Sequence, residues 1–141
     1  KADLRGTRLC DVNLTGVDFS GADISEAHFS NSISKDQLVA TTSYQTGDLA
    51  GIVFARLDLS SVDFSRQNLT RSIFVLCDLS GADFTDAIIT SADFASCIHP
   101  LLTLDQIKST WNYKHGRMEG IRLPEELAEA LRQEKDAGPS E

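Results

Sequence analysis

Large apolar residues recur at every fifth position through most of the chain. In residues 72–94, SIFVLCDLSGADFTDAIITSADF, they fall at Phe74, Leu79, Phe84, Ile89 and Phe94. An α-helix repeats at about 3.6 residues and a β-strand at about 2, so neither element alone accounts for a period of five. The pattern covers two runs, with six apolar centres between residues 4 and 29 and ten between residues 49 and 94.

Each repeat has the same make-up around its apolar centre. Two residues before the centre the side chain is usually small, and the residue just before the centre is usually Asp or Asn. The other two positions favour Ser, Thr, Gly and Arg. A chain with two inward residues in five, and polar residues turned outward, can wind as a solenoid of stacked coils.

The number of repeats in each coil follows from residues twenty positions apart. Phe54 matches Phe74 and Phe94, and Phe64 matches Phe84. Phe and aliphatic centres alternate along the chain, so Phe falls on two opposite sides of a coil and Leu or Ile on the other two. The pattern therefore predicts a four-sided coil of twenty residues.

Several five-residue stretches resemble the pentapeptide-repeat family, whose motif is Ala-(Asp/Asn)-(Leu/Phe)-x-x. They are SGADI at residues 20–24, SSVDF at residues 60–64 and SGADF at residues 80–84. The resemblance covers roughly residues 2–31 and 47–98. It implies an all-β solenoid, a right-handed quadrilateral parallel β-helix whose coils stack about 4.8 Å apart, the ordinary spacing of strands.

Two departures from the repeat share a sequence with each other. A shift of 69 residues aligns the first with the second and matches Asp36 with Asp105, Gln37 with Gln106, Tyr44 with Tyr113 and Gly47 with Gly116. Ser34 and Thr103 stand where a helix begins, and the two glycines where a helix ends. Leu38 with Thr42, and Ile107 with Trp111, have the spacing of one helical face. We expect each departure to be a short helix and loop that leaves the coil wall, with the tyrosine folded back.

The last part of the chain is typical of a helix. Pro124 suits a first turn, with Glu125 and Glu126 beside it, and Leu123, Leu127 and Leu131 form an apolar stripe. We interpret this helix as a cap on the last coil, and a partner-binding or dimerising helix is the alternative.

The predicted organisation therefore has six parts. They are a pentapeptide array (1–33), an inserted helix-loop module (34–47), a second array (48–98), a second copy of the module (99–123), a C-terminal capping helix (124–135) and a disordered tail (136–141).

The charge of the chain narrows the range of partners. Its 13 Lys and Arg against 21 Asp and Glu leave a net charge of −8, which argues against nucleic-acid binding. No apolar run approaches the roughly 18 residues of a membrane span. Acidity raises one alternative, a DNA-mimicking inhibitor of a type II topoisomerase such as gyrase, which some relatives in the resembled family are. Half of the net charge, −4, lies from Pro124 onward and so off the predicted column, and Arg56, Arg66 and Arg71 interrupt the acidic side.

No group of residues has the pattern of a catalytic, cofactor or metal site. The repeated aspartates share one environment, whereas paired catalytic carboxylates need unlike ones. His28, His99 and His115 have no partner at the spacing of metal ligands. Cys77 and Cys97 should lie about 5 Å apart on adjacent coils as buried thiols, with a disulfide or redox pair as the alternative.

These observations favour a non-enzymatic structural or protein–protein interaction module, without a cofactor, from a longer bacterial pentapeptide-repeat protein. We expect partner contacts at the inserted modules, where Trp111 and Tyr113 lie near His115, or at the coil ends. A homodimer is one form that such contacts could take. The free cysteines favour a cytoplasmic setting.

Overall fold

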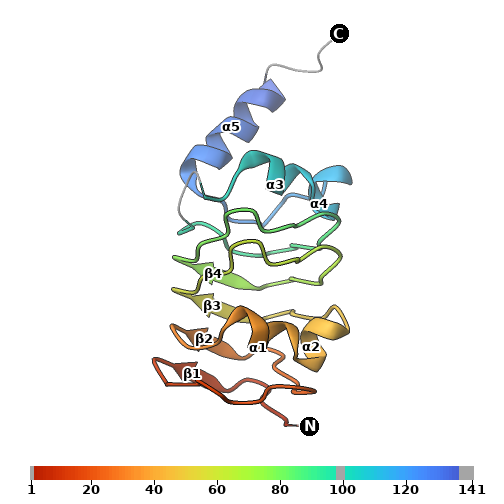
Figure 1. Ribbon diagram of the computed structural model, residues 1–141. Coiled ribbons are helices and arrows are strands. Elements are labelled where there is room, and N and C mark those ends of the chain that lie inside the picture. The colour runs from red at the N-terminus through yellow and green to blue at the C-terminus, as the bar shows by residue number, and fades with distance from the viewer. Residues whose placement is uncertain (1, 98–100, 137–141) are drawn as a thin grey trace.

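The chain folds as a β-helix solenoid, a column of stacked coils (Figure 1). The computed structural model describes residues 2–97 and 101–136. Five successive coils span residues 3–22, 23–47, 48–67, 68–87 and 88–116, as the pairing of each coil with the next defines them. Every helix in the described ranges is too short or too polar to span a lipid bilayer.

One side of the column is a parallel sheet of short strands. The strands are β1 (Arg8–Cys10), β2 (His28–Ser30), β3 (Val53–Ala55) and β4 (Ile73–Val75), hydrogen-bonded in that order. Leu9 pairs with Phe29, twenty residues on, and Phe54 pairs with Phe74 in the same register. Isolated bridges such as Asp58 to Asp78 and Asp63 to Asp83 repeat this twenty-residue register on the other sides.

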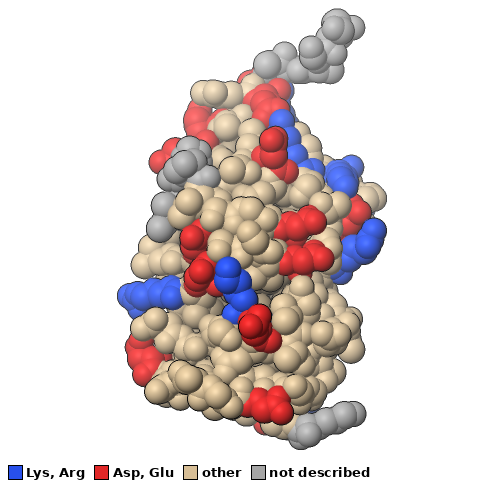
Figure 2. Space-filling view, viewed as in Figure 1, with Lys and Arg blue, Asp and Glu red and all other residues tan. Residues whose placement is uncertain are grey.

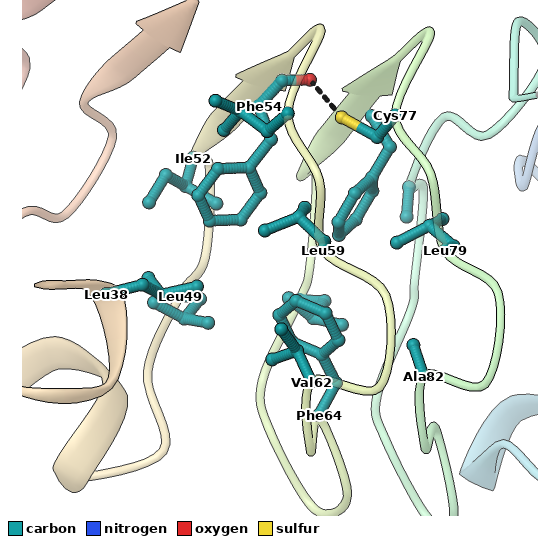
Figure 3. Close-up of a cluster of buried hydrophobic side chains, with 14 of the residues drawn as sticks. Leu38, Leu49, Ile52, Phe54, Leu59, Val62, Phe64, Cys77, Leu79 and Ala82 are labelled. Carbon is teal, nitrogen blue, oxygen red and sulfur yellow. Dashed lines mark hydrogen bonds between the residues drawn. The ribbon is translucent and has the colours of Figure 1, made fainter. Parts of the chain in front are cut away.

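The apolar centres fill the inside of the column. The ring centroids of Phe54 and Phe74 are 5.5 Å apart, those of Phe74 and Phe94 4.9 Å, and those of Phe64 and Phe84 5.3 Å. All five rings are essentially inaccessible to solvent. Figure 3 shows Phe54, Leu59 and Phe64 on successive sides of one coil, all pointing into the same core. The predicted stacking of residues twenty apart is confirmed.

The corners of the coils rest on an unusual backbone conformation. The residue two after an apolar centre has φ between about 49° and 78° wherever the turn is tight, whether or not it is glycine. Ten of these residues carry a side chain: Asp11, Glu26, Asn31, Arg56, Ser61, Arg66, Arg71, Leu76, Asp86 and Ser91. A left-handed residue reverses the chain within one position, and the coil-to-coil hydrogen bonds offset its steric cost.

Two coils are longer because each carries one of the inserted modules. The second coil contains α1 (Lys35–Val39) and α2 (Thr42–Gln45), so the register from β2 to β3 is twenty-five residues instead of twenty. The fifth coil contains α3 (Leu104–Lys108) and α4 (Trp111–Lys114), and Asp93 pairs with Arg122, twenty-nine residues later. The extra four residues fall before α3, since Ser34 follows Phe29 by five positions and Thr103 follows Phe94 by nine.

One detail of the sequence-based expectation is wrong. We expected Leu38 and Thr42 to share a helical face, but the chain begins a new helix at Thr42. Thr41 is extended and caps this second helix, because the Thr42 amide donates to Ala22 O of the coil below and so cannot continue α1. Ile107 and Trp111 are separated in the same way by Thr110, and the Trp111 amide donates to Ala87 O.

The last element that the structure describes is α5 (Glu125–Asp136), which rises from the last coil (Figure 1). Leu127 is buried, and Leu123 and Leu131 pack against the same core. Of the tail predicted at 136–141, Asp136 closes this helix and the other residues lie outside the described ranges.

Candidate interaction surface

The two modules attach to the column through the same contacts. Ser34 and Thr103 are N-caps with a full capping box, which confirms the predicted helix starts. The Gln37 amide Nε2 then donates to Leu14 O and Val17 O of the coil below, at 2.7 and 3.0 Å. The matching amide of Gln106 donates to Leu79 O and Ala82 O, at 2.8 and 2.9 Å. One glutamine therefore both closes the helix start and holds the module on the column.

The second half of each module supplies hydrogen-bond acceptors that a regular coil would supply from its backbone. Ser43 Oγ accepts a hydrogen bond from the Ile24 amide at 2.9 Å, and Asn112 Oδ1 accepts one from the Ile89 amide at 2.7 Å. Ser43 and Asn112 are both buried, so these side chains satisfy backbone groups that a regular strand would satisfy. The modules are thus continuous with the stacked hydrogen bonding of the column.

The two copies differ in what lies on top of them. The third coil covers the first module: Tyr44 Oη donates to Asp63 O at 2.5 Å, and Gln67 Nε2 donates to Tyr44 O at 2.9 Å. The Asn68 amide donates to Gly47 O at 2.8 Å. Burial under this coil raises the pKa of the Tyr44 hydroxyl. The segment of residues 63–68 therefore supplies the cover of the first module.

No further coil covers the second module in the described part of the chain. A Cβ added at Gly116 would meet nothing within 4 Å, whereas at Gly47 it would lie 3.8 Å from Arg66 O. Tyr113 instead lines a pocket of about 770 Å³ with Gly116, Met118 and, from α5, Leu131. Its hydroxyl makes no hydrogen bond to residues 2–97 or 101–136. The surface that is occupied in the first copy is therefore accessible in the second.

The second module is also the more basic copy. Lys108, Lys114 and Arg117 stand where the first module has Val39, Gln45 and Asp48. Lys108 pairs with Glu134 of α5 at 2.5 Å and lies 5.9 Å from the centre of the Tyr113 ring, and Lys114 pairs with Asp86 at 2.7 Å. Arg117 is exposed. These basic side chains therefore belong to the second module, whereas acidic side chains outnumber basic ones on the column.

The predicted aromatic cluster is present in part. The Trp111 indole stacks on the His115 ring with centroids 4.4 Å apart and 20° between the planes. His115 Nδ1 is 2.8 Å from Trp111 O, one turn earlier. Tyr113 faces the pocket toward α5 instead, so the three side chains do not form one site. His28 lies on β2, and His99 is outside the described residues. Within the described ranges no three His, Cys, Asp or Glu side chains gather as metal ligands.

The repeated aspartates hold the corners. Asp58 Oδ1 accepts from the Ser60 amide at 3.0 Å and from Ser60 Oγ at 2.5 Å, and Asp83 does the same with Thr85 at 2.9 and 2.6 Å. These hydrogen bonds, hydroxyl first, lower the pKa of both carboxyl groups. Each carboxylate therefore stabilises the corner that directly follows it.

The two predicted core cysteines are buried thiols on adjacent coils. Cys77 Sγ donates to Phe54 O at 3.3 Å, the dashed contact in Figure 3, and Cys97 Sγ lies 3.5 Å from Phe74 O. Both cysteines are free, and burial raises the pKa of Cys77 to about 11 and that of Cys97 to about 12. They fill space at equivalent corners and have no disulfide between them.

Sequence reasoning missed two features of this surface. The double contact of Gln37 and Gln106 was visible only as an identity between the copies, without a role. The pocket beside Tyr113 depends on the position of α5, and no local sequence pattern predicts that position.

Comparison with known proteins agrees with the geometry. A family model described as pentapeptide repeats matches eight copies, over residues 1–32, 48–86 and 64–98. Neither a curated protein nor a solved structure matches the chain.

Proposed function

The chain belongs to the pentapeptide-repeat family, and from that premise we propose that it is a non-enzymatic protein–protein interaction module. In this proposal the column is a rigid spacer, and the second module is the contact surface. Stacked coils that bond only to their neighbours form an extended, stiff support of this kind.

One observation carries the proposal, namely the unequal cover of two equivalent modules. Residues 63–68 lie on the first, through Tyr44 and Gly47, whereas Tyr113 and Gly116 line an open pocket. The open copy also has a half-exposed Trp111 stacked on His115 and the additional Lys and Arg side chains. Aromatic residues and arginine are enriched in protein interfaces.

We also propose that the column has the right-handed quadrilateral section that the family implies. Four apolar centres in each twenty-residue register, with phenylalanines stacked at two of them, support a four-sided coil. A crystal structure in which successive centres turn by other than about a quarter of the section would contradict it.

DNA mimicry is the second candidate, because Asp58 lies beside Asp78 and Asp63 beside Asp83 in outward rows. Arg56, Arg66 and Arg71 lie at corners of the same coils, and Figure 2 shows basic side chains among the acidic ones on one face. Duplex DNA has an uninterrupted charge about every 1.7 Å. We therefore expect no inhibition of gyrase supercoiling at micromolar protein, and inhibition would favour mimicry instead.

Site-specific photocrosslinking tests the interaction module. A benzophenone amino acid replaces Trp111 in the full chain, and the matched control carries it at Thr42, the equivalent residue of the covered module. After irradiation in an extract of the native cells, we expect one discrete protein adduct from position 111 and none from position 42. The partner is then purified and its affinity for the unmodified chain is measured.

Two outcomes would contradict the proposed function. Equal adducts from both positions would indicate adventitious contact, and a crosslinked protein that does not bind the unmodified chain in the purified system would do the same. Absence of any adduct at position 111, with efficient photoactivation shown by intramolecular products, would also remove the second module as a contact surface.

A further inference from the structure

Resting on the proposed function, we propose that the pocket between α4 and α5 binds one short, acidic segment of a partner protein, which turns a single corner. The segment lies on Tyr113 as residues 63–68 lie on Tyr44. The duplicated module therefore indicates the backbone chemistry of the partner as well as the place where it binds.

The covered copy shows which groups such a segment must present. Tyr44 Oη needs a backbone carbonyl, supplied by Asp63, and Gly47 O needs a backbone amide, supplied by Asn68. The second module presents the same two groups, Tyr113 Oη and Gly116 O, without hydrogen-bond partners in the described ranges. A chain that turns one corner between a carbonyl and an amide five residues later, as residues 63–68 do at Arg66, satisfies both.

The space beside Gly116 is open to such a backbone. At Gly47 the closest approach of the covering segment to an added Cβ would be 3.8 Å, from Arg66 O. Gly116 has φ of +67° and open space at the same point. The pocket can therefore accept a chain that runs as closely past Gly116 as residue 66 runs past Gly47.

α5 limits the occupant to a single segment. The pocket is bounded on one side by Tyr113 and Met118 and on the other by Leu131, Glu134 and Lys135 of α5. Leu127 is buried against the core, so α5 covers part of the coil end. A complete coil, such as the first coil of a second copy, would meet α5, whereas one short segment of a few residues fits a volume of about 770 Å³.

Charge favours an acidic segment. Arg117 lies between the lining residues Gly116 and Met118, and Lys135 lines the α5 side. Of the two acidic residues at the pocket, Glu134 is paired with Lys108, and Glu119 stays as a single negative charge. The first module, which binds a segment of net zero charge, has Asp48 in place of Arg117 and Val39 in place of Lys108. Replacing an acidic and an apolar residue of the first module by two basic residues in the second is expected if the second module binds a more acidic segment.

Peptide titration followed by amide NMR tests this inference. The probes are a peptide of residues 61–68, Ser-Val-Asp-Phe-Ser-Arg-Gln-Asn, with blocked ends, and its Arg66→Glu form. We expect shifts at Tyr113, Gly116, Met118 and Leu131 of the full chain, and tighter binding of the acidic form. Tyr113→Phe should weaken binding by about fivefold, the effect of one neutral hydrogen bond, because it removes only the donor.

Matched variants provide the controls. Tyr44→Phe, in the covered copy, should leave the affinity for the peptide unchanged. Arg117→Ser should abolish the advantage of the acidic peptide, and Lys35→Ser, which removes a cation from the first module, should not.

Three results of the peptide titration would overturn the inference. They are no shifts at millimolar peptide, shifts outside the pocket, and equal effects of Tyr113→Phe and Tyr44→Phe. Light scattering that shows a dimer lost in Tyr113→Phe would identify a second copy as the occupant and overturn the separate partner. A partner crosslinked at position 111 together with a peptide that does not bind would end this inference alone, and the proposed function would stand.

Discussion

The rings of Phe74 and Phe94 lie 4.9 Å apart, centroid to centroid, with only 7° between their planes. The chain makes a full turn between them, so two residues twenty positions apart are immediate neighbours in space. Phe74 also meets Phe64 and Phe84 edge-on, at 5.9 and 6.4 Å. It is therefore enclosed from above, below and across the column.

Truncation of Phe74 should be among the most costly single changes. Phe74→Ala is expected to lower the free energy of unfolding by about 3–5 kcal/mol, because it opens a cavity that stacked coils cannot close. Urea denaturation followed by circular dichroism measures it. Phe19→Ala is the control, since Phe19 lies in the first coil and meets only Phe29 among the rings. An equal loss for both would contradict the account of the core.

Gln106→Ala should destabilise the second module. It removes the donor to Leu79 O and Ala82 O and the acceptor for the Thr103 amide. Leu79 O keeps the hydrogen bond from the Ala82 amide, but the partly buried Ala82 O is left without this donor, and the expected cost is about 1–3 kcal/mol. Hydrogen exchange should show faster opening of α3 and α4, with little change at α1. Gln133→Ala, on the exposed part of α5, is the control and should cost less than about 0.5 kcal/mol.

The corner carboxylates predict a loss of stability in acid. Asp58 and Asp83 have folded pKa values below the ordinary value, first because of the hydroxyls of Ser60 and Thr85. Their contribution is therefore present above the unfolded pKa, about 3.9, and is lost as pH falls through the lower folded values. The thermal midpoint should be level from pH 7 to 5 and fall below about pH 4.

Asp83→Asn tests whether the turn causes this dependence. Asparagine keeps the acceptor and loses the titration, so the variant should fold at pH 7 and show a shallower fall in acid. Because the side chain is exposed, the difference should be small. A variant with the same slope as the parent would show that other groups control the acid transition.

The thiols should differ sharply in reactivity. Burial raises the pKa of Cys77 to about 11 and of Cys97 to about 12, so neither forms much thiolate at pH 8. A thiol reagent should modify Cys10, which is only half-buried, and label the other two on unfolding. Mass spectrometry of the native protein should show one adduct. Rapid labelling of Cys97 would mean that its corner opens readily.

The sequence predicted the column well because its core has a strict period. Phe54, Phe74 and Phe94 repeat at twenty positions, and no helix or flat sheet places them together. The helix starts at Ser34 and Thr103 were equally clear, since a cap depends on residues within one turn. Such features depend on local or periodic information.

What the sequence left open depends on contacts between distant segments. The end of α1 at Thr41 follows from a hydrogen bond between Thr42 and Ala22, on another coil. The pocket at Tyr113 exists because α5 borders, without filling, the space equivalent to the one that residues 63–68 fill over Tyr44. The sequence identity between the two modules indicated that they share a fold. It could not reveal that one module is covered by the next coil and the other is open.

The left-handed corners have a consequence for the outer edge of the column. Arg56 and Leu76 occupy the same corner of successive coils, each with its side chain on a backbone that glycine could equally adopt. Neither side chain contributes to the core. Each residue along this corner can therefore be substituted while the coils keep their shape. The column thus carries a ladder of replaceable groups at one-strand intervals, on which new chemistry could be arranged without redesign of the interior.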